Sequence, residues 1–155
     1  MTNSPHEEQT ILVIEDETDS FDVLRLAVEK AGLKCLLRHL ISVDQGVRYM
    51  EGKERYHDRQ VYPFPSIVLL DIKLGPRLGF EFLEWLHQRP DVERPIVIMW
   101  SDSNAESDIA RAYAAGANSY LVKPTSFREM IRMVEAVDQF WLRRNQPRLA
   151  MVGAH

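Results

Sequence analysis

The stretch Ser66-Ile-Val-Leu-Leu-Asp71 decides the fold of this chain of 155 residues. Its apolar run, Ile67 to Leu70, is the clearest buried strand in the sequence, because a continuous run without alternation is typical of a strand covered on both faces. Such strands belong to parallel sheets that lie between two layers of helices. The run ends on Asp71. We therefore expect a parallel sheet that carries a carboxylate at the end of one strand.

Short β-branched runs alternate with longer amphipathic runs on both sides of this stretch. Four further strands are predicted at Thr10–Ile14, Lys34–Leu40, Pro95–Trp100 and Asn118–Val122. Five helices are predicted at Phe21–Ala31, Ser42–Lys53, Phe80–Leu86, Ser103–Gly116 and Ser126–Arg144. Strict alternation implies a parallel sheet with helices on both faces and right-handed crossovers. The expected fold is therefore α/β, a flavodoxin-like (βα)5 three-layer sandwich with the strand order 2-1-3-4-5.

Local signals mark where several of these elements end. Gly32 and Gly116 are expected to close the first and fourth helices, and Ser103 with Glu106 reads as a capping box that starts the fourth. The segment Glu51–Pro65 is charged and ends in proline, so it is predicted to be a loop.

Length and composition indicate one domain over residues 10–144, with a flexible N-terminus at 1–9 and a tail at 145–155. The net charge of −4 argues against a nucleic-acid binder, which normally carries a basic face. Cys35 is the only cysteine, so an intrachain disulfide is excluded. No apolar run approaches the roughly 20 residues that cross a bilayer. We expect a cytoplasmic protein that binds neither nucleic acid nor membrane.

Five polar residues follow the ends of the predicted strands: Glu15, Asp16, Asp71, Ser101 and Lys123. In an open parallel sheet, ligands bind beyond the carboxyl ends of the strands, so these side chains are expected at one edge. Three clustered carboxylates repel one another and favour a bound cation. Mg²⁺, or Mn²⁺ in its place, meets this need because it prefers oxygen ligands.

The same set of residues suits phosphoryl transfer, which requires mainly positioning and charge neutralisation. Asp71 can act as the nucleophile and form an aspartyl phosphate. Lys123 can pair with one phosphoryl oxygen, and Ser101 can donate a hydrogen bond to another.

Four motifs in this order resemble the response-regulator receiver family, whose best-known member is the bacterial chemotaxis protein. They are Ile-Leu-Val-Ile-Glu15-Asp16-Glu, Ile-Val-Leu-Leu-Asp71-Ile-Lys-Leu, Val-Ile-Met-Trp-Ser101 and Tyr120-Leu-Val-Lys123-Pro124. The resemblance covers about Thr10 to Phe140, which is nearly the whole chain.

The resemblance implies a role for each matching position. Asp71 matches the phosphorylated aspartate. Asp16 matches the direct metal ligand, Glu15 the acid that reaches the metal through water, and Lys73 the residue whose backbone carbonyl ligates it. Lys123 matches the lysine that balances the phosphoryl charge.

Ser101 and Tyr120 match the two switch residues, a hydroxyl that moves toward the phosphoryl group and an aromatic ring that swings inward with it. The resemblance also implies a cis bond between Lys123 and Pro124. Three positions depart from the family pattern. Gly75 stands where proline is usual, Asp102 stands where a small residue usually follows the hydroxyl, and Leu78 stands where a polar residue is usual.

A narrower likeness is to small regulators paired with bacterial phytochromes. It rests on the long stretch Glu51–Pro65 and on the ending Asp138-Gln-Phe-Trp-Leu142. The fifth helix carries an apolar stripe, expected in the core, of Phe127, Met130, Ile131, Val134, Val137 and Trp141. Met133 and Phe140 flank this stripe and widen it.

The predicted function is that of a single-domain response regulator of a two-component phosphorelay, not an enzyme with a separate substrate. A sensor histidine kinase, of the phytochrome type by the narrower likeness, is expected to phosphorylate Asp71. The signal would pass by contact to a downstream protein or to a histidine phosphotransfer protein. The face of the fourth helix, fifth strand and fifth helix is expected to serve partners or a homodimer.

Three alternative functions make different demands on the same positions of the sequence. A phosphatase with an aspartate nucleophile needs an acid two residues after it, where Lys73 stands. A flavin carrier of the same fold needs a glycine- and hydroxyl-rich loop, where the acidic run Glu15–Glu17 stands. A receiver-like module that acts without phosphorylation stays open because Asp102 adds negative charge beside Ser101.

Overall fold

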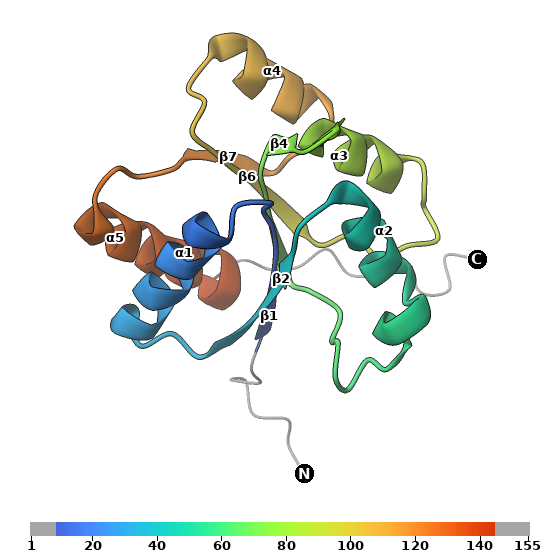
Figure 1. Ribbon diagram of the computed structural model, residues 1–155, viewed down its shortest axis with the longest axis horizontal. Helices are drawn as coiled ribbons and strands as arrows, with labels where there is room; N and C mark the ends of the chain where they lie inside the picture. The colour runs from blue at the N-terminus through green and yellow to red at the C-terminus, as the bar shows by residue number, and fades with distance from the viewer. Residues whose placement is uncertain (1–8, 145–155) are drawn as a thin grey trace.

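The computed structural model describes residues 9–144, which form a parallel sheet between two layers of helices (Figure 1). The strands are β1 (Gln9–Ile14), β2 (Cys35–Leu40), β3 (Ile67–Leu70), β6 (Ile96–Ser101) and β7 (Ser119–Val122). The helices are α1 (Thr18–Ala31), α2 (Val43–Glu51), α3 (Gly79–His87), α4 (Glu106–Ala114) and α5 (Phe127–Val137). The order β2-β1-β3-β6-β7 is the predicted order 2-1-3-4-5 in sequence terms, so the fold class is confirmed.

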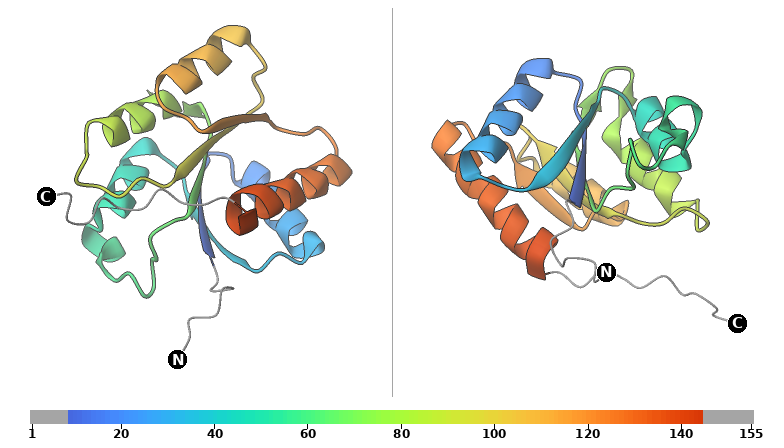
Figure 2. Two further views of the ribbon diagram at one scale, coloured as in Figure 1. Left: turned by 180° about the vertical axis from the view of Figure 1, so that it is seen from behind. Right: turned by 90° about the horizontal axis from the view of Figure 1, so that it is seen from below.

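The helices divide between the two faces of the sheet (Figures 1 and 2). Helices α1 and α5 pack side by side on one face, and α2, α3 and α4 cover the other. Alternation along each strand sends side chains to both layers. In β1, Leu12 and Ile14 join the core under α2 and α3, whereas Ile11 and Val13 join the core under α1 and α5.

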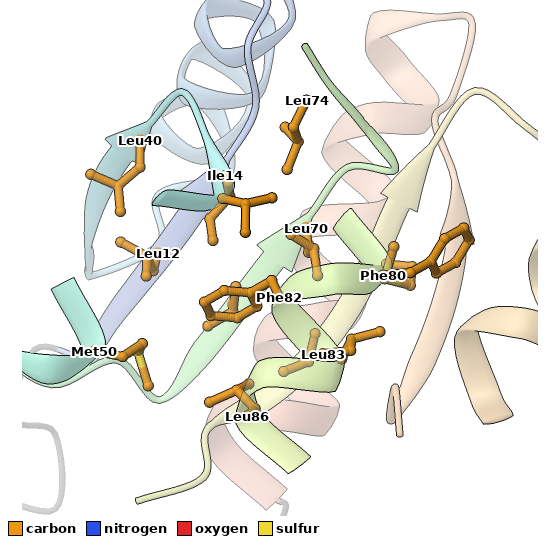
Figure 3. Packing of buried hydrophobic residues seen from close by; sticks show 14 of the residues in the cluster. Leu12, Ile14, Leu40, Met50, Leu70, Leu74, Phe80, Phe82, Leu83 and Leu86 are labelled. Carbon is orange, nitrogen blue, oxygen red and sulfur yellow. The ribbon is translucent and has the colours of Figure 1, made fainter. Parts of the chain in front are cut away.

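The core under α2 and α3 is shown in Figure 3, where Phe82 of α3 lies near Leu70 of β3 and Ile14 of β1. All four residues of β3 are buried. Burying a side chain of this size contributes about 1.5–3 kcal/mol. The central strand is therefore held firmly on both faces, and so is the aspartate that follows it.

Strand register brings the strand ends to one edge of the sheet. Leu70 of β3 pairs with Ile14 of β1 on one side and with Met99 of β6 on the other. In the next pair of strands, Ser101 of β6 lies beside Val122 of β7. The predicted residues Glu15, Asp71 and Lys123 lie just beyond these positions, and Ser101 lies at one of them, so the pairing itself gathers these four side chains.

Most of the predicted helix ends agree with the structure. Gly32 closes α1 in the left-handed conformation, with φ 72°. The hydroxyl of Ser42 accepts a hydrogen bond from the backbone of Gln45 at 3.2 Å and caps α2. The capping box at Ser103 is wrong, because Glu106 is the first residue of α4 and not its third. Ser103 instead donates to Oδ2 of Asp108 at 2.6 Å.

Two segments predicted to be plain loops have structure of their own. The segment after α2 contains a 3-10 turn, η1 (Glu54–His57). The loop after β3 contains a hairpin of two short antiparallel strands, β4 (Lys73–Leu74) and β5 (Arg77–Leu78). Neither segment has the periodicity from which a strand or helix is predicted.

Three finer expectations near the end of the chain need correction. The bond between Lys123 and Pro124 is trans, since no cis peptide occurs within residues 9–144; trans is the more stable form of such a bond. The fifth helix, predicted as one helix that ends at Arg144, is α-helical only as far as Val137 and continues as a π-helical segment, η2 (Asp138–Arg144). Phe127, expected in the core, is 44% exposed because it occupies the first turn of α5. The predicted tail at 145–155 and most of the predicted N-terminus at 1–9 lie outside the described residues.

Candidate functional site

Three carboxylates form a cluster at the carboxyl edge of the sheet. Glu15 and Asp16 directly follow β1, and Asp71 directly follows β3. One ligand atom from each of the three side chains lies within 4.8 Å of the others. Glu15 is fully buried, Asp71 is 8% exposed and Asp16 is exposed. The cluster therefore opens to solvent on the side of Asp16.

Lys123 reaches into this cluster from the end of β7. Its Nζ donates hydrogen bonds to Oε1 of Glu15 and, at 2.9 Å, to Oδ2 of Asp71. Its backbone N–H donates to the carbonyl of Ser101 at 2.8 Å, which fixes the start of the side chain. One ammonium thus bridges two buried carboxylates that follow two different strands, β1 and β3.

The charges in this cluster are not balanced by the lysine alone. Burial raises the pKa of Glu15 to about 7, and the neighbouring carboxylate of Asp71 adds to the rise against the opposing effect of Lys123. Burial would lower the pKa of Lys123, but the hydrogen bonds that its ammonium donates to Glu15 and Asp71 outweigh burial and hold that pKa above its ordinary value. A proton or a further cation is needed to offset the remaining negative charge.

The structure fits a hard divalent cation at this place. Oε2 of Glu15 is buried and has no hydrogen-bond partner among residues 9–144. Carboxylate oxygens from three residues are the ligands that Mg²⁺ and Mn²⁺ prefer. The exposed position of Asp16 leaves access for a cation and for its waters.

Asp71 is held at both oxygens and along its backbone. Oδ1 accepts a hydrogen bond from the N–H of Ile72 at 2.7 Å, and Oδ2 accepts the bond from Lys123. Gly79 passes close to the Asp71 carbonyl, and its own N–H donates to the carbonyl of Ile72 at 2.7 Å. The carboxylate is therefore fixed in direction before any reaction.

Lys73 is placed so that its carbonyl stays outside the β4–β5 ladder. Lys73 pairs with Leu78, and the next pair of residues, Ile72 and Gly79, is joined by a hydrogen bond. Hydrogen-bonded and non-hydrogen-bonded pairs alternate in antiparallel strands, so the Lys73 pair is of the second kind. Its carbonyl ligation of a metal stays a prediction.

Ser101 and Tyr120 come together through the loop after β6. The buried hydroxyl of Ser101 accepts a hydrogen bond from the N–H of Ser103 at 3.2 Å. The hydroxyl of Tyr120, which is half-buried, donates to the carbonyl of Ser103 at 2.7 Å. Ser103 thus links the two residues that were predicted to form a switch. Asp102, between the two serines, is exposed.

Two residues at the site were missed or assigned another role by sequence reasoning. Gly79 had no assigned role, although a glycine at the start of a helix, where it is a poor helix former, was a usable signal. Trp100 is recognisable from the sequence only as the last residue of the apolar strand Pro95–Trp100, whereas its ring in the structure faces the ammonium of Lys123.

Comparison with known proteins decides the family. Residues 11–135 match the family model of the response regulator receiver domain. The chain belongs to the response regulator receiver family. Receiver domains are signalling modules that bind a divalent metal at an acidic pocket, and the carboxylate cluster lies where such a pocket is expected.

Individual relatives show which group of response regulators this chain resembles. The response regulator Rcp1 from Synechocystis sp. PCC 6803 is 29% identical over 143 residues, 92% of this chain and 95% of that protein. The crystal structure of RPA3017, a response regulator in red light signaling of R. palustris, has a TM-score of 0.86 and 30% identity over 92% of this chain and 99% of that one. The bacteriophytochrome response regulator AtBRR has a TM-score of 0.69 and 28% identity over 90% and 99%. The resemblance to phytochrome-associated regulators is confirmed.

No helix within residues 9–144 is both long and apolar enough to span a membrane.

Proposed function

We propose that this receiver domain takes a phosphoryl group on Asp71 from a sensor histidine kinase. The observation that carries the proposal is the bridge from Lys123 to Asp71 and Glu15 inside a three-carboxylate cluster. A nucleophilic carboxylate beside a fixed ammonium and a cation-binding set of acids has the parts that phosphoryl transfer requires.

The transfer exchanges one bond to phosphorus for another. A carboxylate oxygen of Asp71 attacks the phosphorus, the bond from phosphorus to the kinase imidazole nitrogen breaks, and the imidazole keeps that electron pair. The ammonium of Lys123, now 2.9 Å from Oδ2 of Asp71, would pair with a phosphoryl oxygen. The hydroxyl of Ser101 would donate a hydrogen bond to another.

Glu15, Asp16, Asp71 and the carbonyl of Lys73 would hold Mg²⁺ or Mn²⁺. When bound, the cation supplies positive charge that offsets the phosphoryl oxygens and the repulsion within the acidic cluster. The protein residues do the positioning, because the carboxylates extend from strand ends that the core fixes.

The phosphoryl signal would leave the site through Ser101 and Tyr120. Movement of the Ser101 hydroxyl toward the new group would change its contact with Ser103, and Tyr120 is bonded to the same residue. The neighbouring surface of α4, β7 and α5 carries the exposed apolar residues Tyr113, Val122 and Phe127. This face suits a partner protein or a second copy of the chain.

The partners follow from the comparisons. AtBRR is a bacteriophytochrome regulator and RPA3017 acts in red light signaling, so a phytochrome-type histidine kinase in the cytoplasm is the proposed phosphate donor. Rcp1 is matched over 95% of its length. A single-domain regulator that signals by contact, or that passes phosphate to a histidine phosphotransfer protein, is the proposed form of output, without binding of nucleic acid or membrane.

A second candidate is a receiver-like module that acts without phosphorylation. Asp102 favours it, since this exposed acid follows Ser101 and adds negative charge beside the phosphoryl position. The two candidates differ in whether Asp71 is ever phosphorylated.

Intact mass spectrometry separates them. The protein is incubated with acetyl phosphate and Mg²⁺ and compared with Asp71→Asn and with Asp91→Asn, which removes an exposed acid outside the site. We expect a phosphate-sized gain for the wild type and Asp91→Asn but not for Asp71→Asn, and no gain when the cation is chelated. Absence of any gain, with acetyl phosphate and with phytochrome-type kinases, would support the phosphorylation-independent module.

A further inference from the structure

Lys123 has a third partner besides the two carboxylates. Its Nζ lies 4.8 Å from the centroid of the Trp100 ring. A cation within about 6 Å of an aromatic face is attracted by the ring quadrupole, and the attraction strengthens when both groups are withdrawn from water. Trp100 is 0% exposed and Lys123 is 9% exposed. The contact is therefore of the stronger, desolvated kind.

Sheet pairing sets this contact. Trp100 of β6 pairs with Leu121 of β7. Ser101, the residue after Trp100, accepts a hydrogen bond at its carbonyl from the N–H of Lys123. The indole packs into the core under α1 and α5, where Leu24 and Met130 also lie. Because the ring is held by the core, the ring fixes the lysine and not the reverse.

The indole nitrogen of Trp100 indicates that the side chain does more than fill space in the core. Nε1 of Trp100 is buried and has no hydrogen-bond partner within residues 9–144. An unpaired buried N–H is unfavourable, and a phenylalanine would fill much of the same space without one. Trp offers the strongest ring face for a cation, which phenylalanine offers only in part.

We propose that Trp100 is a positioning residue that holds the ammonium of Lys123 in place for phosphoryl transfer. The proposal rests on the function proposed above for Asp71. During transfer the carboxylate of Asp71 becomes an acyl phosphate, and Glu15 would turn from Lys123 toward a cation held in the acidic cluster. The ring of Trp100 is the one of these three partners that the reaction leaves unchanged, so it keeps the amine directed at the site throughout.

The contact itself is tested without phosphorylation. Lysine labelled with ¹³C at Cε is followed by NMR, and the Lys123 signal is assigned by its loss in Lys123→Arg. An indole face shifts the protons of a nearby CH₂ group upfield. We expect the Lys123 signal to be upfield in the wild type, to move toward the other lysines in Trp100→Leu, and to stay in Trp85→Leu. Trp85 is the matched control, since it makes a similar contact with Arg89 in the other layer. An unshifted wild-type signal would overturn the proposal.

The positioning role is tested by a double-mutant cycle on the rate of phosphorylation by acetyl phosphate. Loss of a desolvated cation–π contact should slow Trp100→Leu by about tenfold, and Trp100→Phe by less, with Trp85→Leu unchanged. In a Lys123→Met background, Trp100→Leu should cause no further slowing. Equal slowing in both backgrounds would mean a general structural effect and would overturn the role.

Failure of the proposal is distinguishable from failure of the proposed function. Absence of phosphorylation in the wild type overturns both. A phosphorylated wild type with an unchanged rate in Trp100→Leu overturns the positioning role alone. If Trp100→Leu does not fold, Trp100→Phe carries the test, because its weaker ring face should still give a smaller upfield shift and a slower rate.

Discussion

A Cβ atom on Gly79 would lie 2.0 Å from the carbonyl oxygen of Asp71. No side chain can occupy that space without moving the backbone of one residue or the other. The first residue of α3 and the proposed phospho-acceptor are therefore packed backbone against backbone. This contact explains why α3 begins with a residue that otherwise disfavours helices.

We predict that Gly79→Ala lowers the free energy of unfolding by at least about 2 kcal/mol, because overpacking against fixed backbone is unfavourable. The displaced Asp71 should also be phosphorylated more slowly. Urea unfolding measures the first effect. Gly75→Ala is the comparison, since Gly75 has φ 73° but nothing within 4 Å of its Cβ position. That change should be destabilising by only about 1 kcal/mol, and equal effects of the two substitutions would contradict the clash.

Divalent cations should stabilise the folded protein through the carboxylate cluster. At a Mg²⁺ concentration ten times the dissociation constant, linkage raises the free energy of unfolding by about 1.4 kcal/mol. Thermal unfolding with and without Mg²⁺ measures this. Asp16→Asn and Asp71→Asn should lose most of the gain, whereas Asp91→Asn should keep it. A gain retained in the first two variants would locate the cation elsewhere.

Stability at alkaline pH should depend on Tyr49. Burial raises the pKa of this tyrosine from 10 to about 12, and its hydroxyl donates to the carbonyl of Pro63 at 2.7 Å. The folded state holds the proton more tightly, so this contribution is complete below pH 10 and is lost as the pH rises through 12. By pH 11 the loss is about 1.4 kcal/mol. The difference in unfolding free energy between wild type and Tyr49→Phe should therefore shrink between pH 9 and 11, and a constant difference would contradict the shift.

The segment after α2 should depend on Arg59. Its guanidinium donates to the carbonyls of Met50 and Tyr62 and stacks over the rings of Tyr49 and Phe64. We predict that Arg59→Met lowers the free energy of unfolding by about 1–2 kcal/mol. Arg55→Met is the control.

Arg55 is exposed, and its guanidinium donates to the hydroxyl of Tyr56 on the same turn. The guanidinium also lies over the ring of Tyr56, but because Arg55 is exposed, its loss should change stability by no more than about 0.5 kcal/mol. A comparable loss of stability in both variants would contradict the prediction that Arg59 contributes more than Arg55.

The sheet was predictable because its strands are buried on both faces. Runs such as Ile67–Leu70 are too short for a helix and contain β-branched residues, and strict alternation with helices limits the topology. The β4–β5 hairpin was not predictable, since each strand has two residues. The segment after α2 is held in its conformation by Arg59, which stacks over the rings of Tyr49 and Phe64. The spacing of these residues in the sequence does not reveal that contact.

The site was predictable in position but not in its internal geometry. Strand ends place Glu15, Asp71 and Lys123 at one edge, whatever the side chains do. The packing between β6, β7 and the core determines which carboxylates Lys123 bridges. It also determines that the ring of Trp100 faces the ammonium of Lys123. The failed capping box at Ser103 has a similar origin, because the hydroxyl is engaged by Asp108.

The central claim is that Asp71 carries the phosphoryl group, and trapping the acyl phosphate tests it most directly. Borohydride converts an aspartyl phosphate to homoserine, so the protein is treated with acetyl phosphate and Mg²⁺, reduced, digested and sequenced by tandem mass spectrometry. We predict homoserine at position 71 alone. Homoserine elsewhere, or none in protein that has gained the mass of a phosphate, would contradict the account.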